Sequence, residues 1–88
     1  MATFNLTISS PNGNVFNGEA TCLMLRGAEG DLAILAGHAP FVTSVQPCKI
    51  TIDIDEENQI FATVKGGLLT VGKDAVTLLT ASYKLEKE

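Results

Sequence analysis

The segment Cys48–Val64, CKITIDIDEENQIFATV, decides the fold class of this chain. Its first half places apolar side chains at every second position, at Cys48, Ile50, Ile52 and Ile54. The polar run DEEN follows at 55–58, and the alternation then resumes at Ile60, Ala62 and Val64. A period of two puts the apolar side chains on one face of a β-strand. The segment therefore predicts an amphipathic β-hairpin.

The same alternation recurs along most of the chain. We expect further strands over residues 3–9, 15–16, 19–26, 31–35, 41–45, 68–71 and 75–80. Pro11-Asn12-Gly13-Asn14 favours a hairpin turn, Pro47 is expected to stop a strand, and Gly66-Gly67 to mark a bend or bulge. Only residues 81–88 are compatible with a helix. Many short strands at regular spacing predict an all-β fold, an antiparallel β-sandwich or flattened barrel.

Composition narrows the classes of function. The 88 residues are expected to form a single small domain, and 45% hydrophobic with 18% charged residues is typical of a globular chain. The net charge is −4, and the six basic residues are scattered along the sequence, so we expect no nucleic-acid partner. No apolar run approaches the roughly 18 residues that a membrane-spanning helix needs.

Few residues here suggest catalytic or metal chemistry. Cys22 and Cys48 are expected to be reduced thiols in or near the core, with a disulfide as the less favoured alternative. His38 is the only histidine, and no nucleophile motif accompanies it. The acidic run at 53–57 is expected to be a solvated turn. We therefore expect no catalytic residues, no metal site and no cofactor.

The segment at 29–40, EGDLAILAGHAP, has the character of a recognition surface. Glycines that permit positive φ and a proline that fixes φ flank a short strand, an arrangement that holds a shaped loop at the end of a sheet. His38 either orders this loop by bonding backbone groups or contacts a partner protein. A third reading makes His38 a pH sensor, because imidazole titrates near neutrality.

Two motifs resemble the epsilon subunit of F-type ATP synthase. The first is Gly27–Thr43 (GAEGDLAILAGHAPFVT), and the second is Val64–Val71 (VKGGLLTV) followed by Val76–Leu79 (VTLL). The opening residues Phe4–Pro11 (FNLTISSP) and Val15–Glu19 (VFNGE) match the start of that family. The resemblance runs in order from residue 3 to about residue 82, and the two motifs together are specific.

The resemblance implies a ten-stranded β-sandwich at 1–82 with a tail at 83–88, in a non-catalytic rotor subunit of the central stalk. It implies that Glu29, Gly30 and Asp31 contact the c-ring and that His38, Ala39 and Pro40 contact the gamma subunit. The chain would be peripheral to the membrane through these partners, on the cytoplasmic face of a bacterial plasma membrane rather than on the thylakoid stromal face. In isolation it is expected to be a monomer.

Members of that family commonly continue into two antiparallel helices that carry inhibition and, in some members, bind ATP. This chain stops at Glu88, so we expect it to perform neither role. A competing hypothesis is a free-standing β-sandwich that binds a small ligand or carbohydrate. Such sites need convergent aromatic side chains, and the chain has no Trp, one Tyr and four Phe.

Overall fold

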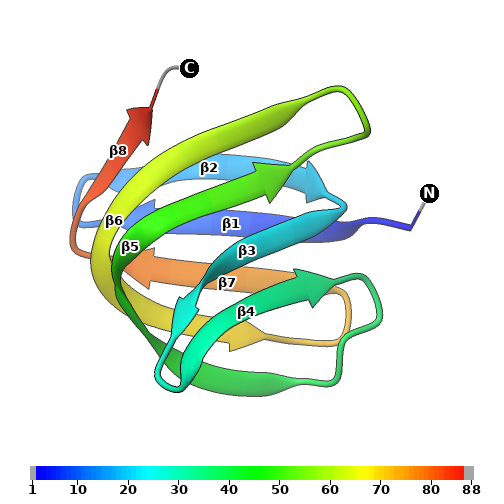
Figure 1. Ribbon diagram of the computed structural model, residues 1–88, viewed down its shortest axis with the longest axis horizontal. Helices are drawn as coiled ribbons and strands as arrows, with labels where there is room; N and C mark the ends of the chain where they lie inside the picture. Colours follow the sequence, from blue (N-terminus) through cyan, green and yellow to red (C-terminus); the bar gives the residue numbers. More distant parts are fainter. Residues whose placement is uncertain (1, 87–88) are drawn as a thin grey trace.

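The computed structural model describes residues 2–86, in which strands alternate with turns (Figure 1). The strands are β1 (Phe4–Ser10), β2 (Gly13–Ala20), β3 (Cys22–Gly27), β4 (Gly30–Leu35), β5 (Phe41–Asp53), β6 (Gln59–Val71), β7 (Ala75–Thr80) and β8 (Tyr83–Glu86). They pair in the order β2-β1-β7-β6-β5-β3-β4, and β8 pairs with β6. All neighbours are antiparallel except β1 and β7, which are parallel. The predicted all-β class is confirmed.

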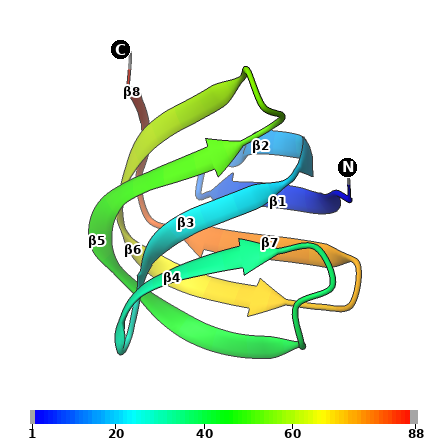
Figure 2. The same cartoon turned by 45° about the vertical axis from the view of Figure 1, so that its right-hand side comes forward.

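The single sheet bends over onto itself and makes two layers without closing into a barrel (Figures 1 and 2). One layer holds β2, β1, β7 and the adjoining halves of β6 and β5. The other holds β8, the remaining halves of β6 and β5, and the β3–β4 hairpin. β5 and β6 therefore belong to both layers, which places the core between their inner faces.

The core is formed by the apolar side chains that the alternation predicts. Nine large ones are almost inaccessible to solvent: Leu6, Ile8, Leu23, Ile34, Ile50, Ile52, Val64, Leu69 and Leu78. Each fully buried Leu, Ile or Val contributes about 1.5–3 kcal/mol relative to exposure. The predicted hairpin is present, because Ile50 faces Ala62 and Ile52 faces Ile60 in the β5–β6 pairing.

Within residues 2–86 the structure has eight strands, where the resemblance implied ten, and two of the interruptions predicted from the sequence lie inside long strands. β5 runs through Pro47, which faces Lys65, and β6 runs through Gly66 and Gly67. Both strands turn at the same level and keep their register there. Before the bend the odd-numbered residue Val45 of β5 faces the core. After the bend the even-numbered residues Ile50 and Ile52 face it, so the inward face shifts by one residue. Proline and glycine thus bend these strands without ending them.

A close backbone approach fixes this bend. A Cβ on Gly67 would overlap the carbonyl oxygen of Leu79 in β7, and Gly66 has a φ of +99°. The buried Thr80 hydroxyl donates to the carbonyl of Gly66 at 2.5 Å and also lies 3.0 Å from the carbonyl of Ser82. β7 and β8 consequently follow one edge of β6 on either side of the glycine pair.

The segment for which the sequence allowed a helix contains β8. Tyr83–Glu86 pairs with residues 61–64 of β6, so the sheet extends past residue 82, and residues 87–88 lie outside the described residues. Tyr83 is half-buried against the core, and burial raises the pKa of its phenol. Pairing with β6 gives the backbone N–H and C=O groups of β8 hydrogen-bond partners. An isolated helix of this length would be only marginally stable.

We expect Gly67→Ala to destabilise the protein by about 3 kcal/mol, because the new methyl group meets rigid backbone rather than a movable side chain. Gly18→Ala is the matched control, since its new Cβ would lie 3.7 Å from Phe16 in ordinary contact. Urea unfolding compares the two variants with the parent chain. An unchanged urea midpoint for Gly67→Ala would show that the bend does not depend on this approach.

The ionisation of Tyr83, the single tyrosine, reports whether β8 packs on the core. We expect its phenol to titrate above its usual value of about 10 in an ultraviolet absorbance titration, because burial disfavours the phenolate. Since the folded pKa exceeds the unfolded pKa, the stabilisation is present below about pH 10 and is lost as pH rises through the folded value. A midpoint equal to that of the urea-unfolded chain would contradict the packing of β8.

Candidate functional site

The turn between β3 and β4 carries the predicted c-ring residues. Gly27 and Gly30 face each other at its base, and Gly30 has a φ of +121°. Glu29 is exposed at the tip. Arg26 Nε donates to Asp31 Oδ1 at 2.9 Å, and this hydrogen bond, with the adjacent charge, raises the pKa of the guanidinium. Asp31 is thus partly neutralised, which leaves Glu29 as the tip's uncompensated anion.

The loop between β4 and β5 carries the predicted gamma residues, His38, Ala39 and Pro40, and all three are exposed. Gly37 has a φ of +83°, and the backbone N–H of His38 donates to the carbonyl of Leu35 at 3.2 Å. His38 Nδ1 lies 3.0 Å from the carbonyl oxygen of Ala39, and its ring centroid is 5.0 Å from that of Phe41. These contacts hold the imidazole against the start of β5, so His38 both orders the loop and stays exposed.

The two predicted contact sites do not come together. They lie at opposite ends of β4, whose six residues at about 3.3 Å each separate them by roughly 20 Å (Figure 1). A single short strand therefore places one site at each end of the β3–β4 hairpin. This separation suits two different partners better than one shared ligand.

An uncharged surface runs in two neighbouring rows across the outer face of the first layer, and we call it the neutral face. The strand registers align two rows across β2, β1, β7, β6 and β5: Asn17, Thr7, Thr77, Thr70 and Val42, then Asn14, Ser9, Leu79, Leu68 and Ser44. Val42, Leu79 and Leu68 are 61%, 49% and 42% exposed, and neither row contains an ionisable side chain. Exposed apolar side chains among uncharged polar ones characterise protein-binding surfaces.

The neutral face and the His38 loop are neighbours along the chain, although Phe41 turns toward the core and Val42 away from it. Phe41, on which the His38 ring packs, directly precedes Val42 at the end of the first row. Sequence reasoning found the loop from its glycines and proline but missed the face. Its members are spread over five strands, and only the register shows that they are neighbours.

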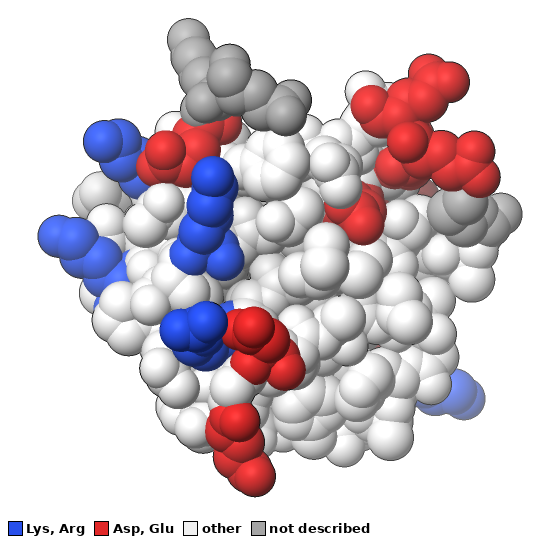
Figure 3. Space-filling model, viewed as in Figure 1, with Lys and Arg blue, Asp and Glu red and all other residues white. Residues whose placement is uncertain are grey.

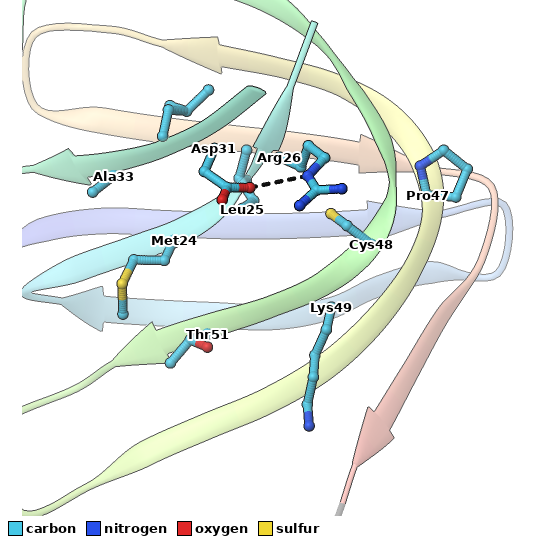
Figure 4. A pocket seen from close by; sticks show the side chains of 10 residues that line it. Met24, Leu25, Arg26, Asp31, Ala33, Pro47, Cys48, Lys49 and Thr51 are labelled. Atoms are coloured by element: carbon cyan, nitrogen blue, oxygen red, sulfur yellow. Dashed lines mark hydrogen bonds and ion pairs between the residues drawn. The ribbon is translucent and has the colours of Figure 1, made fainter. Parts of the chain in front are cut away.

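A hollow lies between β3, β4 and β5, where the β3–β5 register is interrupted between Met24 and Gly27 (Figure 4). Its volume is about 600 Å³. Its lining residues are Met24, Leu25, Arg26, Asp31, Leu32, Ala33, Pro47, Cys48, Lys49 and Thr51, with no aromatic side chain among them. Because sugar-binding sites rely on convergent aromatic residues, the hollow does not favour a carbohydrate-binding function.

The basic side chains are less scattered than the sequence indicated. Lys49 and Lys84 both face Thr63, Lys65 lies two residues further along β6, and Arg26 lines the hollow beside Lys49. Figure 3 shows most of the blue side chains on the left of this view with red ones among and below them, one blue side chain at the lower right, and a larger red group at the upper right. Strand pairing thus brings basic residues from four strands to one side of the molecule, although they are scattered along the sequence.

The two cysteines and the possible metal ligands within residues 2–86 do not form a further candidate site. Cys22 and Cys48 are free and half-buried, as expected, and burial followed by the negative charge of Asp53 raises the pKa of the Cys22 thiol. Within residues 2–86 no group of three or more His, Cys, Asp or Glu side chains could hold a metal ion. The same residues include no helix with the length and apolar character that crossing a membrane requires.

These features define the class of protein, a β-sandwich whose exposed turn, loop and neutral face are suited to protein contacts. Residues 3–85 match the family described as ATP synthase, Delta/Epsilon chain, beta-sandwich domain. The chain belongs to this family, which confirms the resemblance found in its motifs.

Solved structures share the fold. A chain of the Euglena gracilis mitochondrial ATP synthase, in a cryo-EM structure of OSCP/F1/c-ring in rotational state 1, superposes with a TM-score of 0.89 and 20% identity over 97% of this chain. A chain from the central stalk and c-ring of Tetrahymena thermophila mitochondrial ATP synthase gives a TM-score of 0.79 and 12% identity over 93% of this chain. Our chain spans 54% and 66% of the lengths of those two chains.

Proposed function

We propose that this chain is a non-catalytic central-stalk subunit of a proton-translocating F-type ATP synthase that joins the gamma subunit to the c-ring. Membership of the delta/epsilon family supports the assignment to such an enzyme. The observation that carries the coupling role is the separation of two exposed surfaces at opposite ends of β4. A rigid domain with a contact site at each end can transmit torque between two partners.

The gamma subunit is proposed to bind the His38 loop together with the neutral face. Leu68 and Leu79 face each other in the β6–β7 pairing, and Val42 is the most exposed large apolar residue of the described chain. Burying these side chains stabilises a complex without desolvating any charge. The threonine, serine and asparagine side chains around them supply hydrogen bonds at the margin of the interface.

The c-ring is proposed to bind the turn at Glu29, Gly30 and Asp31. Its exposed carboxylates suit the polar, partly basic loops that the family resemblance implies for the ring. The affinity of an exposed electrostatic contact of this kind falls with ionic strength, whereas binding through the uncharged neutral face does not depend on it. The two contacts should therefore respond differently to salt.

The location of the chain follows from these partners. It would be peripheral to a coupling membrane, held there by the c-ring and the gamma subunit. Both solved structures are mitochondrial complexes, and the cytoplasmic face of a bacterial membrane remains a prediction from the sequence.

Substitutions on the neutral face test the gamma contact. We expect Leu68→Asp and Leu79→Asp each to weaken binding to purified gamma subunit by about tenfold or more, because a carboxylate would have to be buried at the interface. Leu85→Asp is the matched control, since Leu85 is 57% exposed on β8 outside the neutral face. Calorimetric titration measures the affinities, and equal losses for all three variants would count against the proposed face.

Charge removal in the turn tests the c-ring contact. Glu29→Gln is expected to weaken binding to detergent-solubilised c-ring more than Asp31→Asn does, because Arg26 already compensates Asp31. Both effects should fade at high salt, and neither variant should change the affinity for gamma. A c-ring affinity that is indifferent to both substitutions at low salt would refute the assignment of this turn.

A further inference from the structure

The basic side of the molecule offers a surface outside the proposed gamma contact, and it borders the proposed c-ring turn at Asp31. We call it the basic bend and define it by Arg26, Lys49, Lys65 and Lys84. These residues come from β3, β5, β6 and β8, and they lie on the outer face where β5 and β6 turn from one layer to the other (Figures 1 and 3). Thr63 lies at its centre, with Lys49 and Lys84 on either side.

The positive charge of the basic bend is only partly compensated: the Thr63 hydroxyl at its centre donates to the Glu86 carboxylate at 3.0 Å, and Asp31 pairs with Arg26. Among residues 2–86 the only ion pair joins Arg26 to Asp31, so no described carboxylate pairs with the three lysines. The Lys49 ammonium lies over the ring of Phe61, 5.6 Å from its centroid. The chain as a whole carries a net charge of −4, so this concentration of positive charge contrasts with the rest of its surface. It would attract an acidic partner.

The hollow described above adjoins the basic bend. Met24, Leu25 and Leu32 give it apolar walls, and Met24 is 39% exposed. Arg26 uses Nε to bind Asp31, and Figure 4 shows the rest of its guanidinium directed toward Cys48 at the side of the hollow. The site thus combines unpaired cations with a depression that can take an apolar side chain.

We propose that the basic bend and this hollow bind an acidic polypeptide segment of a neighbouring protein, with carboxylates on the lysines and an apolar side chain in the hollow. Charge complementarity selects an acidic partner, and the apolar walls favour a polypeptide over a phosphate group, which has no apolar part. The acidic balance of the whole chain disfavours nucleic acid. The surface lies outside the neutral face, so it leaves the gamma contact free.

Titration of the isotope-labelled chain with a short peptide of alternating glutamate and leucine tests this site by NMR. The amide signals of Lys49, Thr63 and Lys84 and those of the residues that line the hollow are expected to shift. Lys49→Gln should weaken binding about two- to fivefold, and substitution of all three lysines by glutamine about tenfold or more. Lys73→Gln is the matched control, because it removes the same charge from the turn between β6 and β7.

Two further probes distinguish binding of an acidic peptide from binding through apolar side chains or through negative charge alone. A peptide of alternating glutamine and leucine, and tripolyphosphate, should each bind at least about tenfold more weakly than the glutamate peptide. The proposal is overturned if tripolyphosphate binds as tightly, if Lys73→Gln has the same effect as Lys49→Gln, or if the glutamate peptide does not bind. The substituted lysines, at positions 49, 65, 73 and 84, are all exposed, so the variants should fold, and their amide spectra check this. Neither gamma nor the c-ring is present, so failure here leaves the proposed function untouched.

Discussion

The contact between the backbones of Gly67 and Leu79 is the constraint on which the rest of the structure depends. It allows β6 to cross from one layer to the other while keeping its pairing with β5, and Thr80 fixes the crossing through its bond to Gly66. A small domain buries a modest fraction of its surface. Because β5 and β6 belong to both layers, a chain of this length can still enclose a core between them. Any side chain at Gly67 would push β6 and β7 apart at the bend.

The bend also determines where the exposed surfaces lie. Because β5 turns away from β3 near Pro47, the pairing of β3 with β5 is interrupted and the hollow forms beside the basic bend. The β3–β4 hairpin projects past this point, which puts the acidic turn at one end of β4 and the His38 loop at the other. The core holds these surfaces at fixed separations, as the proposed coupling role requires.

Local patterns predicted the strands, the family, and the turn and loop at 29–40, but not the neutral face or the basic bend. The alternation at Ile50 and Ile52 identified a strand face because burial follows the period of two. The sequence could not show that Pro47 and Gly67 lie within strands, since both residues usually end them and only pairing across β5 and β6 overrides that tendency. The neutral face and the basic bend combine residues far apart in the chain, so register alone reveals them. The separation of the two predicted contact sites required the structure in the same way.

The central claim is that one rigid domain binds gamma and the c-ring at the same time through separate surfaces. Sedimentation of the chain with detergent-solubilised c-ring, before and after saturation with gamma subunit, tests it most directly. If the surfaces are separate, the gamma-saturated chain binds the ring with an affinity equal to or greater than that of the free chain. Displacement of the chain from the ring by gamma would show that the two partners share one surface, and it would contradict the coupling role.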